Sequence, residues 1–346
     1  MTDHGSVSAI DLFCGAGGLA YGLQRSGVDV VAGIDVDPDC QYPFTTNNSA
    51  DFYLRDIRSV SGEELTKIWG SGDGLKVLAG CAPCQPFSTL RQAGKKNKDE
   101  KWNLLREFGR LVDETGPEFI TMENVPGLAR TDVFSDFVSG LTANGYLVDH
   151  QVVFLPNYGL PQHRKRLVLV ASRIGQIQVP KGTHTPDTYA TVKDVIGEIE
   201  PIIHGQQSTS DPVHRTQALS ERNLQRIRSS SPGGTWREWP KELQLACHKK
   251  ETGKYYASVY GRMEWDSPSP TITTQFYNYG TGRFGHPEQD RAISLREGSA
   301  LQGFPLDYKF VPSGERITID KIGRLIGNAV PPVLGTVIGE SIMSAL

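Results

Sequence analysis

One cysteine in this sequence has the surroundings expected of a nucleophile. Cys84 follows a short apolar run, residues 76–80, and lies between Pro83 and Pro86, which stiffen the backbone. The spacing Cys81-x-x-Cys84 also suits a redox pair or half of a zinc site, but no second Cys or His pair follows to complete a tetrahedral set. Ligands bind at the carboxyl ends of strands in open α/β sheets. We therefore predict that Cys84 is a nucleophile at such an edge.

A carboxylate and two arginines also lie beside apolar runs that are expected to be strands. Glu123 ends a second apolar run, residues 119–122, and is expected to face the same crevice, where it would serve as general acid. Arg164 and Arg166 alternate along residues 162–166 and would project to one side of an extended chain. A positive charge there would lower the pKa of a neighbouring thiol and so activate it.

A glycine-rich turn opens the first βαβ pattern of the chain. Gly15, Gly17 and Gly18 lie between an expected strand over residues 8–13 and an expected helix over residues 19–26. Glycine lets a ligand approach the backbone closely, and the start of a helix offers unpaired N–H groups. Asp35 ends the next expected strand, where a carboxylate can bind a ribose. The pattern predicts a cofactor that contains a nucleoside.

The elements that must position these groups alternate along the first half of the chain. Further apolar runs at residues 76–80, 119–123, 152–155 and 166–171 are separated by helical stretches, which predicts an α/β fold with a mostly parallel sheet. Residues 176–290 are rich in Pro, Gly, Ser, Thr and Gln, so we expect a second, loop-rich module there, followed by a final helix over residues 334–345.

Composition and charge exclude several classes of protein and indicate one kind of partner. The 346 residues are 22% charged and 9% aromatic, which excludes disordered and fibrous classes. Five cysteines, no apolar run near the ~20 residues of a membrane span and no leader-like start predict a soluble intracellular protein. Residues 1–80 carry a net charge of −6 and residues 162–260 a net charge of +6, an asymmetry that indicates nucleic-acid contact by one part of the molecule.

Taken together, the motifs resemble the cytosine-C5 DNA methyltransferase family. The matching blocks occur in the expected order: Asp11 to Gly18, Pro83 to Ser88, Glu123 to Val125, Gln162 to Arg166, Arg296-Glu297 with Leu301 to Pro305, and Gly327 to Pro332. The resemblance implies a Rossmann-like class I methyltransferase domain over residues 1–200 and 320–346, with a smaller target-recognition domain over residues 201–319. It also implies S-adenosylmethionine as methyl donor, S-adenosylhomocysteine as product and no metal.

The resemblance also assigns roles to individual residues. It implies Cys84, Glu123, Arg164 and Arg166 as the catalytic set, with Cys84 adding to C6 of a cytosine flipped out of duplex DNA. The implied cofactor pocket comprises Phe13, Gly15, Gly17, Gly18, Asp35, Asp56, Ile57, Pro83, Leu104, Asn328 and Val330. The expected DNA contacts are Gln85, Ser88, Arg91, Lys95 and Lys96 after the nucleophile, and Arg222, Arg226, Arg237 and Thr271 in the middle of the chain.

Other functions remain open at this point. A tRNA cytosine-C5 methyltransferase shares the motifs, although the middle segment lacks the Cys-Phe-Thr tripeptide of that branch. A non-catalytic DNA-binding relative would be expected to lose Cys84 or Glu123, and both are present. NAD-linked oxidoreduction fits neither the incomplete glycine pattern nor the other motifs. We expect a monomeric bacterial or archaeal enzyme of the cytoplasm, paired in function with a restriction endonuclease.

Overall fold

The computed structural model describes residues 6–83, 98–250, 253 and 255–346. These residues form two compact units. The first comprises Met1–Tyr158, Lys165–Thr183 and Ala329–Leu346, and the second comprises Gly159–Arg164 and His184–Asn328. The second unit thus interrupts the first at two places in the sequence, residues 159–164 and residues 184–328. The assignment of a catalytic role to residues 1–200 and 320–346 and of target recognition to residues 201–319 stays a prediction.

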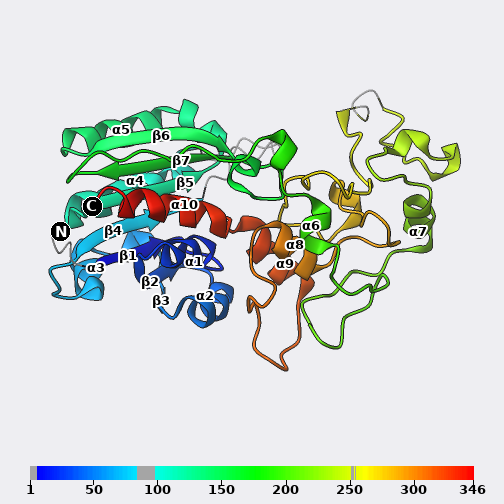
Figure 1. Cartoon of the computed structure of the whole chain (residues 1–346), viewed down its shortest axis with the longest axis horizontal. Helices are drawn as coiled ribbons and strands as arrows, with labels where there is room; N and C mark the ends of the chain where they lie inside the picture. Colours follow the sequence, from blue (N-terminus) through cyan, green and yellow to red (C-terminus); the bar gives the residue numbers. More distant parts are fainter. Residues whose placement is uncertain (1–5, 84–97, 251–252, 254) are drawn as a thin grey trace. The chain divides into compact units, whose positions relative to one another are not determined.

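A seven-stranded sheet forms the centre of the first unit (Figure 1). Its strands are β1 (Val7–Leu12), β2 (Asp29–Asp35), β3 (Asp51–Leu54), β4 (Leu75–Gly80), β5 (Phe119–Asn124), β6 (Leu147–Phe154) and β7 (Lys165–Ser172). The order across the sheet is β3-β2-β1-β4-β5-β7-β6. Strands β1 to β5 pair in parallel, whereas β7 runs antiparallel to both β5 and β6. The predicted α/β fold with a mostly parallel sheet is confirmed.

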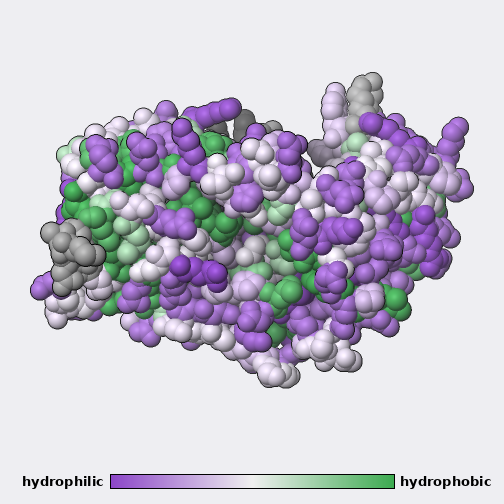
Figure 2. Space-filling model, in the orientation of Figure 1, coloured by the Kyte–Doolittle hydropathy of each residue, from purple (hydrophilic) through white to green (hydrophobic). Residues whose placement is uncertain are grey.

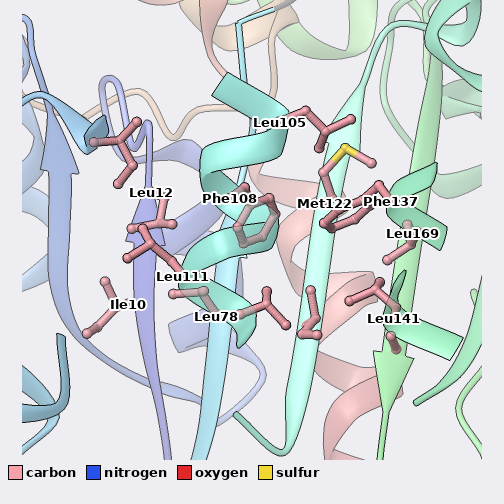
Figure 3. Packing of buried hydrophobic residues seen from close by; sticks show 14 of the residues in the cluster. Ile10, Leu12, Leu78, Leu105, Phe108, Leu111, Met122, Phe137, Leu141 and Leu169 are labelled. Carbon is pink, nitrogen blue, oxygen red and sulfur yellow. The ribbon is translucent and has the colours of Figure 1, made fainter. Parts of the chain in front are cut away.

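Three helices cover one face of this sheet: α3 (Gly62–Trp69), α4 (Lys98–Thr115) and α5 (Asp132–Ala143). Figure 3 shows Phe108 and Leu111 of α4 lying over Leu12 and Leu78 of the strands. Both α4 side chains are fully buried. Burying aromatic and aliphatic side chains of this size stabilises the fold by roughly 1.5–3 kcal/mol each, so this layer fixes the sheet on which the site is built.

Other helices of the first unit are α1 (Gly18–Arg25), α2 (Gln41–Asn48) and α10 (Pro332–Met343). Helix α10 packs against α1, so the two ends of the chain meet. Gly22 makes this approach possible, because a Cβ atom there would lie 2.1 Å from the Pro332 carbonyl oxygen and 2.6 Å from the Gly335 Cα. Any side chain at position 22 would therefore push the helices apart. The 3-10 helices of this unit are η1 (Pro38–Cys40), η2 (Ile57–Ser59), η4 (Pro126–Arg130) and η5 (Leu155–Tyr158).

The second unit has little regular structure. Its helices are α6 (Val192–Ile196), α7 (Glu221–Arg228), α8 (Leu295–Leu301) and α9 (Ile319–Asn328), with 3-10 turns η6 (Pro186–Thr188), η7 (Trp236–Glu238), η8 (Lys241–Leu243) and η10 (Tyr279–Thr281). Its described residues contribute isolated β-bridges but no strand of the sheet. The prediction of loop-rich structure is therefore confirmed for these residues.

The second unit contains a buried ion pair as well as buried apolar side chains. Arg291 is fully buried and donates two hydrogen bonds of 2.7 Å, one to each carboxylate oxygen of Glu297. Glu297 also accepts from the Ser294 backbone N–H at 2.7 Å and completes a capping box at the start of α8. Every carboxylate oxygen of this pair is satisfied, as a buried charge requires.

One segment passes a test for membrane-spanning length and hydropathy, contrary to the expectation from sequence. Residues Ile319–Met343 meet it by composition, but 72% of the most apolar window is buried inside the protein. The segment is also two helices, because α9 ends at Asn328 and α10 begins at Pro332. Its hydropathy is that of core helices.

Candidate active site

The carboxyl ends of β4 and β5 are fastened together by side chains. Gly80 of β4 is paired with Met122 of β5, and the chain continues from there into Cys81 and Ala82. The Asn124 side-chain amide donates to the Ala82 carbonyl at 2.8 Å. The Cys81 backbone N–H donates to the Leu12 carbonyl of β1 at 3.3 Å. The residues that precede Cys84 are thus held to both neighbouring strands.

Glu123 lies at this edge as the sequence predicted, and it is 3% exposed. One carboxylate oxygen, Oε1, lies 2.6 Å from Nε of Arg166 on β7 and forms an ion pair without hydrogen-bond geometry. The other oxygen, Oε2, accepts a hydrogen bond of 2.9 Å from the thiol of Cys81. Three elements therefore meet at one carboxylate, because β4, β5 and β7 are neighbours in the sheet.

Several residues predicted to act in catalysis or DNA binding lie outside the part of the chain that the structure describes. Cys84, Gln85, Ser88, Arg91, Lys95 and Lys96 lie outside the described residues. Their roles as nucleophile and as DNA contacts remain predictions. Pro83, just before this gap, is exposed, and Leu104 of α4 is partly buried against the main core.

The predicted glycine turn follows β1 directly. Phe13, Gly15 and Gly17 all have positive φ angles, of 57°, 54° and 88°. Gly17 then caps α1, which begins at Gly18. A Cβ atom on Gly15 would meet nothing within 4 Å, so the turn leaves open space beside its backbone. A phenylalanine at positive φ is rare, and such conformations cluster at ligand sites.

Asp35 closes this turn from β2. Its carboxylate accepts hydrogen bonds of 2.9 Å from the backbone N–H groups of Gly15 and Asp37. Burial raises the pKa of Asp35 above its usual value, against the lowering effect of these two donors. Val36, the next residue, is 67% exposed and offers an apolar surface beside the turn that the sequence analysis did not single out.

A second acid, Asp11 of β1, lies behind the turn. Burial and then the charge of Asp35 raise the pKa of Asp11 to about 8. Its Oδ2 atom has no hydrogen-bond partner among the described residues, and the side chain is 1% exposed. Buried polar atoms are nearly always paired. A neutral, partly unsatisfied acid at this place marks a functional region rather than a stabilising contact.

The other predicted cofactor residues lie in different surroundings. Asp56 caps η2, and hydrogen bonds from Arg58 lower its pKa to about 2. Ile57 is buried in the main core. Val330 is buried in the first unit, whereas Asn328 is exposed and belongs to the second unit. The roles of these four residues stay predictions.

The two arginines expected to act together belong to different units. Arg166 is in the first unit with Glu123, and Arg164 is in the second. Arg164 is buried and donates to the Gln162 side-chain oxygen at 3.3 Å and to the Ile272 carbonyl at 3.1 Å. Thr271 donates to the His163 carbonyl at 2.5 Å. In this structure Arg164 fastens the segment that contains Thr271.

The arginines expected to contact DNA also differ among themselves. Arg222 and Arg237 are exposed, and Figure 2 shows hydrophilic residues dominating this face of the molecule around α7. Arg226 lies on the same helix but is buried. It donates to the Leu243 carbonyl at 2.9 Å and lies over the Tyr260 ring at 5.4 Å. We therefore keep Arg222 and Arg237 as candidate DNA contacts and assign Arg226 to packing.

Cys81 is a residue of this site whose contact could not be predicted from sequence. The Cys-x-x-Cys spacing drew attention to this residue, but its partner Glu123 is 42 positions away, which no local pattern reveals. Within the described part of the chain, no three His, Cys, Asp or Glu side chains form a set that could hold a metal ion.

Comparisons with known proteins place this chain in a family. The family model described as C-5 cytosine-specific DNA methylase matches residues 7–344. The chain is 50% identical to the Type II methylase M.HgiDII of Herpetosiphon aurantiacus, covering 97% of this chain and 94% of that protein. It is 30% identical to the Type II methyltransferase M1.HphI of Haemophilus parahaemolyticus, covering 98% and 87%.

A solved structure shares the fold. It is a provisionally assigned DNA modification methyltransferase encoded within an Escherichia coli prophage, with a TM-score of 0.75 and 22% identity over 98% of this chain and 99% of that one. The predicted resemblance and the Rossmann-like class I fold are thereby confirmed. On these matches across nearly its whole length, the chain belongs to the C-5 cytosine-specific DNA methylases.

Proposed function

We propose that this protein transfers a methyl group from S-adenosylmethionine to C5 of a cytosine flipped out of a specific short duplex DNA sequence. The observation that carries the proposal is the buried Glu123 carboxylate, paired with Arg166 where the carboxyl end of β5 lies beside the amino end of the antiparallel β7. It lies one strand from the chain leading to Cys84, and two strands from the glycine turn after β1. The segment that leads to Cys84, the acid and the glycine turn thus share one edge of one sheet.

The residues after β1 and β2 fit the proposed cofactor. The open space beside Gly15 would admit the methionine part, Asp35 would accept hydrogen bonds from the ribose, and Phe13 and Val36 would contact the adenine. Gly17, Gly18, Asp56, Ile57, Pro83, Leu104, Asn328 and Val330 complete the proposed pocket. When bound, S-adenosylmethionine supplies an electrophilic methyl group on its sulfonium.

The protein's own residues make the cytosine reactive. C5 is a poor nucleophile, so the Cys84 thiolate adds to C6 and electron density moves toward N3 and C5. Glu123 protonates or hydrogen-bonds N3 and stabilises that change, while Arg166 contacts the pyrimidine O2. After methylation, loss of the C5 proton and departure of Cys84 restore the aromatic ring. The base must be flipped, because C5 and C6 are inaccessible in a stacked duplex.

The second unit supplies DNA recognition in this proposal. Arg222, Arg237 and Thr271, with the loop residues Gln85, Ser88, Arg91, Lys95 and Lys96, are the proposed contacts. The Type II names of the relatives support a place in a restriction-modification system, with a restriction endonuclease as functional partner. We infer a cytoplasmic, monomeric enzyme of a bacterium or archaeon.

A trapping experiment tests the chemistry. DNA with 5-fluorocytosine at the target should form a covalent complex in the presence of S-adenosylmethionine, because the fluorine cannot leave as the C5 proton does. Cys84→Ser should abolish the complex. An adduct that survives this change would reject Cys84 as nucleophile.

A second experiment tests the substrate. Bisulfite sequencing of a host that expresses the protein should reveal 5-methylcytosine at one short motif. Labelled S-adenosylmethionine incubated with duplex DNA or tRNA separates the proposal from the tRNA alternative: label on tRNA alone would reject DNA as substrate.

A further inference from the structure

We propose that Cys81 is a positioning residue, whose thiol proton fixes the second carboxylate oxygen of Glu123 while Arg166 holds the first. The inference rests on the proposed role of Glu123 and adds a residue to that site. It assigns a separate task to each cysteine of the Cys-x-x-Cys segment, with Cys84 as nucleophile and Cys81 as hydrogen-bond donor.

The geometry leaves the thiol little freedom. The Cys81 backbone is bonded to Leu12 at 3.3 Å, and the next residue, Ala82, is bonded to Asn124 at 2.8 Å. Asn124 is also the residue after Glu123, so donor and acceptor sit on backbones that are fastened to each other. The 2.9 Å separation of Sγ and Oε2 is therefore set by the ends of two adjacent strands.

The protonation state required for this role follows from the surroundings. Burial first, and then the charge of Glu123, raise the pKa of Cys81 well above its usual value. The charged groups that act on the thiol are Glu123 of β5, Arg166 of β7 and Asp11 of β1, and of these Arg166 alone lowers the pKa. At neutral pH Cys81 thus keeps its thiol proton, and the S–H group donates a hydrogen bond to the Glu123 carboxylate.

A thiol is a suitable hydrogen-bond donor for a carboxylate that must later bind substrate. An S–H group is a weak donor, so Oε2 can exchange this bond for one to the pyrimidine at small cost. A stronger donor at the same place would compete with the substrate. The ion pair with Arg166 meanwhile keeps the carboxylate from rotating out of the site.

The test compares Cys81→Ala, which removes the donor, with Cys81→Ser, which keeps one. Cys81→Val, which fills the space without a donor, replaces the alanine variant if that variant does not fold. Cys247→Ala removes an exposed cysteine and controls for loss of a thiol. The first measurement is the carbon-13 chemical shift of the Glu123 carboxyl carbon in free protein at neutral pH, labelled at the glutamate carboxyl and assigned with Glu123→Gln.

A hydrogen bond to a carboxylate favours its charged form, so losing the bond raises the pKa. Loss of the bond also changes the electron density at the carboxylate, so we expect the Glu123 carboxyl signal at neutral pH to move in Cys81→Ala and to return towards the wild-type position in Cys81→Ser. The same signal position in wild type and Cys81→Ala, or no recovery in Cys81→Ser, would overturn the proposal.

The second measurement uses methyl transfer to DNA. We expect kcat to fall about tenfold in Cys81→Ala with KM for DNA within about twofold, and to recover in Cys81→Ser. A loss of kcat that Cys81→Ser does not restore would reject the hydrogen bond as its cause. Because the carbon-13 measurement needs no substrate, a Cys81-dependent Glu123 signal in an inactive wild-type protein would reject the proposed function and leave the pairing intact.

Discussion

Each unit of this protein contains a buried arginine–glutamate pair, and the two pairs are built differently. In the second unit Arg291 and Glu297 are 0% and 1% exposed and share two hydrogen bonds of 2.7 Å. In the first unit Arg166 is 15% exposed and approaches one oxygen of Glu123, whose other oxygen receives only a thiol. The first unit thus leaves bonding capacity on its carboxylate, and the second uses all of it.

The difference separates a pair that holds a fold from one that can serve a ligand. Burial alone would raise the pKa of Glu297, but the charge and hydrogen bonds of Arg291 outweigh it and bring that pKa to about 2. Asp11, equally buried in the first unit, has no such partner, and its pKa rises to about 8. The two buried acids thus differ in charge state: a counter-charge keeps Glu297 ionised, whereas burial keeps Asp11 protonated.

The largest effect should come from removing the Glu123 charge. Glu123→Gln keeps the shape of the side chain but loses the acid, and we expect methyl transfer to fall by about 100- to 10,000-fold. The matched control is Glu118→Gln, because Glu118 pairs with Arg173 at 2.9 Å at the opposite end of β5. Single-turnover rates check this. Equal losses in both variants would remove the distinction between the two ends of the strand.

The corresponding change in the second unit should act on stability. Glu297→Gln leaves Arg291 buried without its counter-charge, and we expect the free energy of unfolding to fall by about 3–5 kcal/mol. Arg228→Gln is the control, since the Arg228–Asp290 pair is exposed and should contribute less than about 1 kcal/mol. Denaturant unfolding measures both. Similar losses in the two variants would contradict the importance of burial.

Asp11 should make the stability of the folded protein depend on pH. Between its usual pKa of 3.8 and its folded value of about 8, the folded protein holds a proton that the unfolded chain releases, so stability falls as pH rises. Asp11→Asn removes this dependence. The difference in free energy of unfolding between the variant and wild type should therefore change in favour of the variant by about 2–4 kcal/mol from pH 5 to pH 8. Unfolding measured across that range gives the result, and a constant difference would reject a neutral Asp11.

The smallest effects should separate two arginines of α7. Arg222→Ala should weaken DNA binding about three- to tenfold and reduce the salt dependence by about one phosphate contact, without change in stability. Arg226→Ala should lower the free energy of unfolding by about 1–3 kcal/mol, since its side chain packs on Tyr260. Binding titrations at several salt concentrations and unfolding curves test both. The reverse assignment of effects would show that Arg226 is the DNA contact.

Much of the first unit was predictable because its strands are short apolar runs bounded by glycine or acidic residues. The predicted run at residues 76–80 and the observed β4 differ by one residue. β6 begins at Leu147, five residues before the predicted run, because Asp149, His150 and Gln151 make this outer strand polar. β3 was not predicted as a strand, since its four residues lie at the sheet edge and are partly or fully exposed.

The second unit was predictable only as loop-rich. Its structure depends on charged side chains with distant partners, such as Arg296 with Asp211, 85 positions apart. Composition indicates that such residues are abundant, but not which of them are buried. The same limit applies to Arg226 and Arg164. Their types and spacing predict contact with DNA or substrate, which stays a prediction, but do not reveal their hydrogen bonds to the Leu243 and Ile272 carbonyls.

The packing of α1 against α10 through Gly22 has a consequence for synthesis. The layer over that side of the sheet stays unfinished until the ribosome has made Pro332–Met343, more than 300 residues after α1. A nascent or prematurely terminated chain would therefore expose the apolar face of α1 and be open to proteolysis. Competence for methyl transfer would then arise only after α10 has been translated.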